Sequence, residues 1–190
     1  RKEHIDAAKG GQLKLIIRGG VGVDNIDVDY AKANGIDVKN TPRASSQSVA
    51  ELAMGHMFAC ARYLSIAGHT MREGKWEKKA YGKGIELQGK TLGIVGFGRI
   101  GQHLGVMAKA IGMKVIAFDI ALINAERIAK MKDGVVIINT SRGSNVDEDA
   151  LLAALESGKV RAAGLDVYAD EPASNVALYS HPMVSCTPHI

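Results

Sequence analysis

The sequence predicts an α/β protein with a doubly wound parallel sheet in residues 42–190 and part of a second, flavodoxin-like domain in residues 1–41. Short β-branched runs, glycine-containing turns and helical spacings of apolar residues alternate along the chain, a rhythm typical of parallel sheets covered by helices. The 190 residues, 46% of them apolar, suffice for one core domain plus part of another.

The amino-terminal elements predict the partial domain. The run from Leu13 to Arg18 is expected to be a buried strand, Asp29 to Asn34 a short helix, and Ile36 to Lys39 the next strand. Pro42 then interrupts the pattern, and the boundary between the two domains is expected there.

A long helix is expected next. Apolar residues recur at spacings of three and four from Ser46 to about Thr70. A charged stretch with several glycines follows and carries Trp76, the only tryptophan. A new unit of alternating strands and helices begins after Lys90.

This unit has the alternation of a doubly wound sheet. A helix or loop after each strand carries the chain back to the edge where the next parallel strand begins. The expected strands are Thr91–Phe97, Lys114–Asp119, Val135–Thr140, Ala163–Tyr168 and Met183–Thr187, and the expected helices are Arg99–Ile111, Asn124–Met131 and Asp147–Glu156.

Composition excludes several classes of function. The net charge of +4 is spread without a basic run and aromatic residues make up 5%, which disfavours nucleic-acid binding and favours small anionic ligands. No apolar run is long enough for a membrane span, and the polar amino end does not resemble a signal peptide. The separated Cys60 and Cys186 fit a reducing, cytoplasmic compartment, and no cluster has metal-ligand spacing, so no metal site is expected.

A glycine motif follows the first strand of this unit. Gly96, Gly98 and Gly101 stand in the order G-F-G-R-I-G at the start of a helix. The first glycine permits a tight turn, the second lets the backbone approach a diphosphate, and the third lets helix and strand pack closely. Amides near Arg99 and Ile100 would then face the phosphates, as in a Rossmann-like dinucleotide site.

An acidic residue strengthens this interpretation. Asp119 ends the next strand, 18 residues after Gly101, where a carboxylate can accept hydrogen bonds from the adenosine ribose. The same charge would repel a 2′-phosphate, so the expected cofactor is NAD rather than NADP. A glycine turn retained only for structure is the alternative.

The chain resembles the D-2-hydroxyacid dehydrogenases, and most of all their phosphoglycerate dehydrogenase branch. The resemblance covers nearly the whole chain. The matching segments are RGGVGVDNID (18–27), NTP (40–42), SVAE (48–51), GKTLGIVGFGRIG (89–101), NTSRG (139–143), VDEDAL (146–151), GLDVYADEP (164–172) and TPHI (187–190).

The resemblance implies a catalytic role for Arg142, Glu171 and His189. A histidine can take the hydroxyl proton of a secondary alcohol, a carboxylate can fix the tautomer of its ring, and an arginine can hold a substrate carboxylate. Taken singly, His189 could be a terminal histidine without function, Arg142 a surface cation and Glu171 an ordinary loop acid. Their joint placement in matching segments favours catalysis.

The resemblance also implies further ligand contacts. Asp166 matches a position near the nicotinamide carboxamide, Thr140 and Ser141 should line the same ring, and Arg142 and His189 should contact the cofactor as well. In the amino-terminal part, Val21 and Gly22 would offer backbone amides to the substrate carboxylate. Arg18 is the candidate for a substrate phosphate, with a plain glycine turn as the alternative reading of this stretch.

The resemblance also implies an assembly. Residues 43–84 correspond to the family's dimerisation arm and carry an aromatic anchor, so a homodimer is expected, although the helix could equally be ordinary core.

The sequence departs from the family pattern at one point. After Ile120 the family would continue with another helix and strand, whereas Ala121 follows at once. Residues are therefore expected to be absent between Ile120 and Ala121.

The expected activity is hydride transfer between NAD and a D-2-hydroxy acid, with 3-phosphoglycerate the first candidate and serine biosynthesis the implied pathway. Glyoxylate or hydroxypyruvate reduction and D-lactate oxidation share the same core chemistry. An NAD(H)-sensing module similar to the corepressors of this fold is the alternative outside enzymes.

Overall fold

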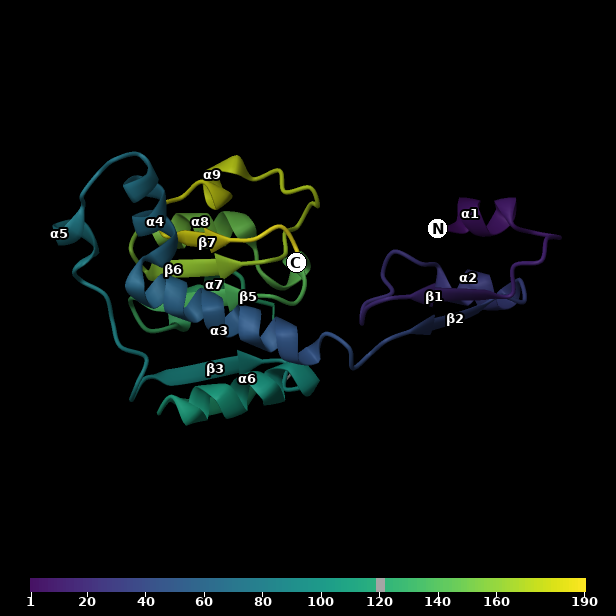
Figure 1. Ribbon diagram of the computed structural model, residues 1–190, viewed down its shortest axis with the longest axis horizontal. Helices are drawn as coiled ribbons and strands as arrows, with labels where there is room; N and C mark the ends of the chain where they lie inside the picture. Colours follow the sequence, from purple (N-terminus) through teal and green to yellow (C-terminus); the bar gives the residue numbers. More distant parts are fainter. Residues whose placement is uncertain (119–121) are drawn as a thin grey trace. The chain divides into compact units, whose positions relative to one another are not determined.

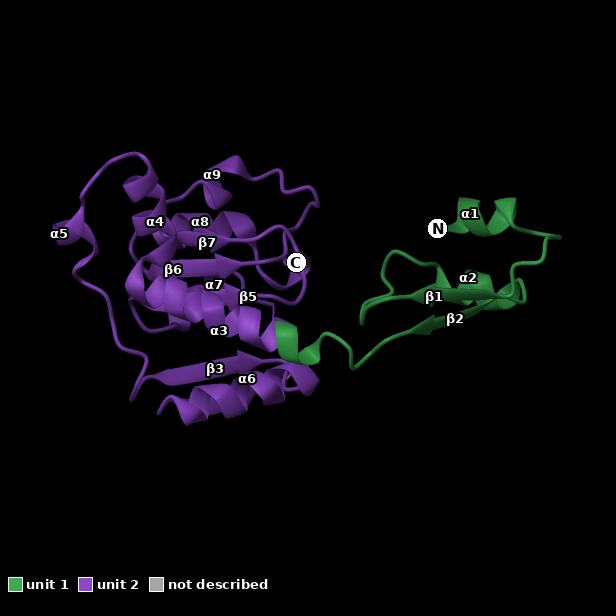
Figure 2. Ribbon diagram, viewed as in Figure 1, with its two compact units in different colours: residues 1–48 green, residues 49–190 purple. Residues whose placement is uncertain are grey.

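The structure is a computed structural model that describes residues 1–118 and 122–190 and divides into two compact units, residues 1–48 and residues 49–190 (Figure 2). Asp119, expected to contact the ribose, lies outside the described residues. The expected discontinuity between Ile120 and Ala121 lies outside them too.

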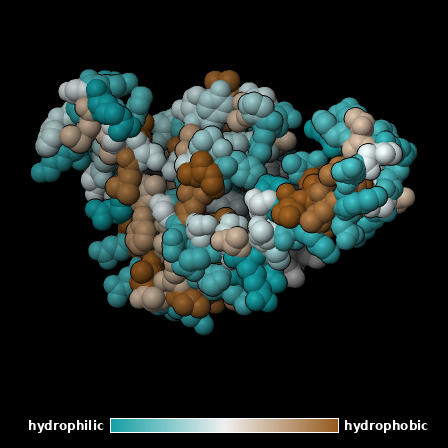
Figure 3. All heavy atoms as spheres, turned by 45° about the vertical axis from the view of Figure 1, so that its right-hand side comes forward, coloured by the Kyte–Doolittle hydropathy of each residue, from teal (hydrophilic) through white to brown (hydrophobic). Residues whose placement is uncertain are grey.

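The first unit pairs two parallel strands with two short helices. Its elements are α1 (Lys2–Ala7), β1 (Leu15–Arg18), α2 (Val28–Ala33) and β2 (Asp37–Asn40). Ile5, Ala31 and Ile36 form its buried core. Leu15 and Ile17 of β1 are 44% and 67% exposed, and Figure 3 shows hydrophobic surface on this unit. The strand expected from Leu13 to Arg18 is therefore present, but its expected burial is wrong, because the alternation in β1 leaves one face of the small sheet uncovered by its own helices.

The second unit contains the remaining elements (Figure 1). They are α3 (Ser46–Arg62, whose first residues belong to the first unit), α4 (Leu64–Arg72), α5 (Lys78–Tyr81), β3 (Thr91–Val95), α6 (Arg99–Ala110), β4 (Lys114–Phe118), α7 (Ala125–Lys130), β5 (Val135–Asn139), the 3-10 turn η1 (Gly143–Asn145), α8 (Glu148–Glu156), β6 (Val160–Leu165), α9 (Val176–Tyr179) and β7 (Val184–Cys186).

Every strand pairing in the described residues is parallel, and the predicted α/β class is confirmed. β3 pairs with β4, while β5, β6 and β7 form a sheet in that order. The sequence predicts a single sheet here. Among the described residues, however, no hydrogen-bonded ladder joins β3 to β5. Apolar side chains join the two sheets instead: Ile138 of β5 packs in one cluster with Met57 of α3 and Leu104 of α6.

The expected single helix from Ser46 to Thr70 is wrong in one respect. It breaks at Tyr63, whose backbone is left-handed (φ 58°), and continues as α4. A left-handed residue cannot continue a right-handed helix. Arg161 of β6 holds Tyr63 in place, because its guanidinium donates to the Tyr63 hydroxyl at 2.5 Å and lies 5.2 Å from the ring centroid.

Helices cover both faces of the three-stranded sheet. In Figure 1, α3 crosses in front of β6, with α7 and α8 behind the sheet. The core on the α7 and α8 side contains Leu151, Val160 and Leu178, which are at most 1% exposed. The longest described helix, α3, has 17 residues, and no described helix is long and apolar enough to span a membrane.

Leu151 tests this core. Because its side chain is fully buried, Leu151→Ala should lower the free energy of unfolding by about 2–5 kcal/mol. Val176→Ala, at an apolar side chain that is 58% exposed, should change it by less than about 0.5 kcal/mol. Urea unfolding followed by circular dichroism measures both. Equal losses in the two variants would contradict the assignment of Leu151 to the core.

Candidate active site

The carboxyl ends of β5, β6 and β7 lie side by side. The parallel register sets Asn139 opposite Leu165, and Leu165 opposite Cys186. The loops after these three strands therefore leave the same edge of the sheet, which is the ligand edge of open α/β sheets. These loops carry Arg142, Glu171 and His189.

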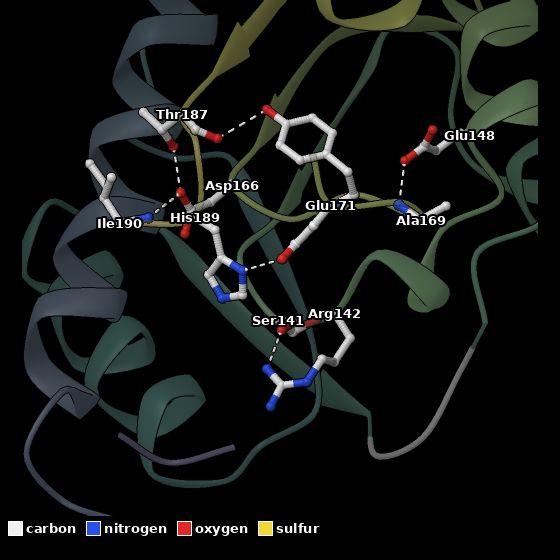
Figure 4. Close-up of polar contacts among 10 residues, drawn as sticks. Ser141, Arg142, Glu148, Asp166, Ala169, Glu171, Thr187, His189 and Ile190 are labelled. Carbon is white, nitrogen blue, oxygen red and sulfur yellow. Dashed lines mark hydrogen bonds and ion pairs between the residues drawn. The ribbon is translucent and has the colours of Figure 1, made fainter. Parts of the chain in front are cut away.

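His189 and Glu171 form a hydrogen-bonded pair at this edge (Figure 4). Nδ1 of His189 lies 2.8 Å from Oε2 of Glu171, and Oε1 of the same carboxylate accepts from the Tyr168 amide at 3.3 Å. The hydrogen bond with His189 lowers the pKa of Glu171, which is therefore ionised at neutral pH. An ionised carboxylate only accepts, so Nδ1 carries the proton, and Nε2 of the neutral ring has a lone pair for a substrate proton.

A buried carboxylate holds the turn that carries His189. Oδ1 of Asp166, a residue 2% exposed, accepts from the Thr187 hydroxyl at 2.7 Å and from the Ile190 amide at 3.1 Å. These bonds bracket His189, whose backbone is left-handed (φ 57°). Such a conformation is costly outside glycine and persists where the surroundings enforce it. The resemblance did not indicate this positioning contact of Asp166.

Asn139 shapes the loop that carries Arg142. Its side-chain oxygen accepts from the Ser141 amide at 3.1 Å and from the Ser141 hydroxyl at 2.8 Å, while its amide nitrogen donates to the Arg142 carbonyl at 2.8 Å. Thr140 lies in the same loop and is partly buried. Sequence reasoning did not assign Asn139 a role, although an asparagine that ends a strand is a common signal for such a turn.

Arg142 lies in this loop, and in Figure 4 its guanidinium turns back toward Ser141, below the Glu171–His189 pair. Its guanidinium donates to the Ser141 carbonyl at 2.7 Å, and its charge contributes to the lowered pKa of Glu171. The next residue must be small, because a Cβ at Gly143 would overlap the backbone of Tyr168 and Ala169. The structure thus brings together the three residues expected to be catalytic.

A pocket of about 340 Å³ adjoins Glu171 and His189. Its lining is mostly apolar and aromatic. The residues that line it are Tyr168, Glu171, Pro172, Ala173, Tyr179, Cys186, Thr187, Pro188 and His189.

The glycine loop has the geometry that its sequence motif predicts. Gly96 adopts φ 89°, and a Cβ at Gly101 would overlap the carbonyl of Gly96, so α6 and β3 approach too closely for a side chain there. Gly98 begins α6 without a side-chain cap. The first-turn amides, at Arg99 and Ile100, therefore lie where a helix start binds phosphate.

Of the expected substrate residues, Arg18, Val21 and Gly22 lie in the first unit, Arg18 at the end of β1 and the other two in the loop that follows. The Arg18 guanidinium donates to the Gly19 carbonyl at 2.7 Å, and the Asn40 side chain donates to the Val21 carbonyl at 2.7 Å. The Thr41 amide donates to the Gly20 carbonyl at 3.1 Å. These bonds tie the loop that contains Val21 and Gly22 to the end of β2.

The Glu171–His189 pair makes a prediction about acid stability. Because the pKa of Glu171 lies below its usual 4.5, the ionised carboxylate stabilises the fold above that pH, and this contribution is lost as the pH falls through the lowered pKa. Urea unfolding should find Glu171→Gln less stable than wild type at pH 7, with the gap closing toward pH 3. Glu156→Gln, an exposed control on α8, should show no such trend. A gap that is independent of pH would rule out the pairing.

Family comparisons cover both parts of the chain. Residues 1–118 match the catalytic domain of the D-isomer specific 2-hydroxyacid dehydrogenases, and residues 120–190 match the NAD binding domain of the same family. Among curated relatives, hydroxypyruvate reductase of Thermotoga maritima is 49% identical over 95% of this chain and 71% of its own length. D-3-phosphoglycerate dehydrogenase of Methanocaldococcus jannaschii is 42% identical over 95% of this chain, which spans only 42% of that relative.

Solved structures agree with these matches. A glyoxylate reductase from Paecilomyes thermophila has a TM-score of 0.85 and 36% identity, covering 100% of this chain and 68% of its own. D-lactate dehydrogenase from Aquifex aeolicus, complexed with NAD and lactic acid, has a TM-score of 0.81 and 29% identity over 98% of this chain and 78% of its own.

The predicted cofactor, NAD, is confirmed by the NAD binding domain. With its domain matches, its relatives and its arrangement of parallel strands, the chain belongs to the D-isomer specific 2-hydroxyacid dehydrogenases, a family of NAD-dependent enzymes.

Proposed function

We propose that this protein transfers a hydride between NAD and a small D-2-hydroxy acid. The observation that supports this most is the pairing of His189 with an ionised Glu171 beside Arg142, at the carboxyl edge of the sheet. In this proposal residues 1–41 are part of the substrate-binding domain and residues 42–190 form the NAD-binding domain.

Each residue has a distinct part in the proposed reaction. Nε2 of His189 takes the proton of the substrate hydroxyl, Glu171 keeps the ring in the required tautomer, and the Arg142 guanidinium binds the carboxylate and polarises the carbonyl of the keto acid. NAD, when bound, supplies the hydride acceptor. Backbone amides at Arg99 and Ile100 would hold its diphosphate.

The remaining cofactor contacts are proposed from the resemblance. Thr140, Ser141 and Asp166 would line the nicotinamide, and the carboxylate of Asp119 would disfavour the 2′-phosphate of NADP. Free thiols at Cys60 and Cys186 are consistent with a cytoplasmic location.

For the substrate we propose 3-phosphoglycerate, oxidised to 3-phosphohydroxypyruvate in serine biosynthesis, with Arg18 as the phosphate contact. The match to D-3-phosphoglycerate dehydrogenases supports this choice. Hydroxypyruvate or glyoxylate reduction is the second candidate, favoured by the 49% identity to a hydroxypyruvate reductase. Oxidation of D-lactate and NAD(H) sensing without turnover are further alternatives.

A kinetic comparison tests the substrate. Following NADH absorbance with phosphohydroxypyruvate, hydroxypyruvate, glyoxylate and pyruvate should give the highest kcat/KM for the phosphorylated acid. Arg18→Ala should raise KM for that acid about tenfold or more, because a charge-assisted contact is lost, and leave KM for hydroxypyruvate nearly unchanged. Arg43→Ala, which removes another exposed arginine, is the control.

Equal changes in KM for both acids would contradict the phosphate contact. A higher kcat/KM for hydroxypyruvate would favour the reductase. NADH binding without turnover of any of the four acids would favour a sensor.

We also propose that the protein is a homodimer joined by the arm of residues 43–84. Trp76, Met71 and Leu64 of this arm are 79%, 60% and 57% exposed. Large apolar side chains on a monomer surface are expected to be covered by a partner when they cluster.

Sedimentation velocity tests the dimer. Wild type should sediment as a dimer at micromolar concentration, whereas Trp76→Ala should shift the equilibrium toward the monomer by removing an anchor residue. Val106→Ala, at an apolar side chain 69% exposed on α6, is the control and should remain dimeric. A monomeric wild type would refute the assembly.

A further inference from the structure

His56 is a buried histidine that the proposed reaction does not use. It lies on α3 and is 3% exposed. The helix approaches β6 so closely there that a Cβ at Gly164 would lie 2.6 Å from the His56 Cβ. The His56 side chain therefore packs directly against β6.

Both ring nitrogens of His56 have hydroxyl partners. Nδ1 lies 3.0 Å from Oγ of Ser185 in β7, and Nε2 lies 3.2 Å from Oγ1 of Thr187, just after β7. Ser185 also receives a hydrogen bond from the Ser65 hydroxyl, at 3.0 Å. A chain of hydrogen bonds therefore runs from α4 through His56 to the loop that carries His189.

The direction of this chain is fixed at its far end. Thr187 donates its one hydroxyl proton to the Asp166 carboxylate at 2.7 Å, so toward His56 it can only accept. Nε2 of His56 must then carry a proton. A neutral ring leaves Nδ1 as the acceptor for the Ser185 hydroxyl, which agrees with Ser185 accepting from Ser65. Burial lowers the pKa of His56, against an opposing effect of Asp166, and supports the neutral ring.

The same carboxylate connects the chain to the reacting group. Oδ1 of Asp166 accepts from the Thr187 hydroxyl and from the Ile190 amide, on either side of the left-handed His189. The Thr187 hydroxyl and the Ile190 amide thus share one acceptor, beside the backbone that places the His189 ring next to Glu171.

We propose that His56, as the neutral Nε2–H tautomer, is a positioning residue: it orders Thr187 and Asp166, and through them it holds His189 in its working orientation. This inference rests on the proposed function in assigning His189 as the base. His56 itself touches neither substrate nor cofactor.

Two substitutions of His56 in the full-length protein test the proposal. His56→Leu removes both hydrogen bonds and should lower kcat by up to about 10²-fold, because small misplacements of a catalytic group have effects of that size. The affinity for NADH should fall much less than kcat does, because the amides at Arg99 and Ile100 that would hold the diphosphate are untouched. His56→Gln, which keeps one donor and one acceptor, should recover most of kcat.

Met57→Ala is the matched control. Met57 neighbours His56 on α3 and is buried in an apolar cluster, away from the hydrogen-bonded chain. It should lower Tm while kcat stays near the wild-type value. If Met57→Ala lowers kcat as much as His56→Leu does, or if His56→Leu keeps the wild-type kcat, His56 is only structural and the proposal fails.

Nitrogen-15 NMR of the histidine rings provides a readout that needs no turnover. In wild type, His56 should show a protonated Nε2 and an unprotonated Nδ1 at neutral pH, and the His189 ring signals should shift in His56→Leu but not in Met57→Ala. A proton on Nδ1 of His56, or His189 signals that are unmoved in His56→Leu, would overturn the proposal even if the variants fold poorly. An inactive wild type with the expected His56 tautomer would instead count against the proposed reaction.

Discussion

The parallel register of β5, β6 and β7 is the constraint on which the candidate site depends. It sets the ends of three strands level, so that loops separated by many residues in sequence leave the sheet at one edge. Leu151, Val160 and Leu178 fill the space between this sheet and its helices. The level strand ends bring the loops that carry Arg142, Glu171 and His189 to one edge, and close packing of the core beneath them resists a shift of the strands.

The local parts of this arrangement could be predicted from sequence. Each expected strand exists, and Gly96 adopts the turn and Gly101 the close packing that the motif requires, because these features depend on residues near one another in the chain. The helix break at Tyr63 could not be predicted, since Arg161, 98 positions later, holds it. His56 is a similar case: its partner Ser185 is 129 positions away, and the helical pattern alone indicates only a helix residue.

β4 exposes apolar side chains that a sheet strand usually buries. Ile116 and Phe118 are each 64% exposed on this strand, although apolar residues on a strand usually face a core. An edge strand with such a surface is a site for pairing or aggregation unless something covers it. The family pattern, with a further helix and strand after Ile120, would provide such a cover.

Two carboxylates impose opposite tautomers on the two histidines of the site. Glu171 accepts a hydrogen bond from Nδ1 of His189 directly, which leaves Nε2 of that ring unprotonated. Asp166 acts through the Thr187 hydroxyl and requires the proton of His56 on Nε2. An ionised carboxylate can only accept, and each neutral imidazole has one proton to donate. In the proposed reaction the exposed His189 exchanges a proton with substrate, and in the proposed positioning role the buried His56 holds the loop. The same side-chain chemistry serves catalysis or positioning according to which ring nitrogen the carboxylate engages.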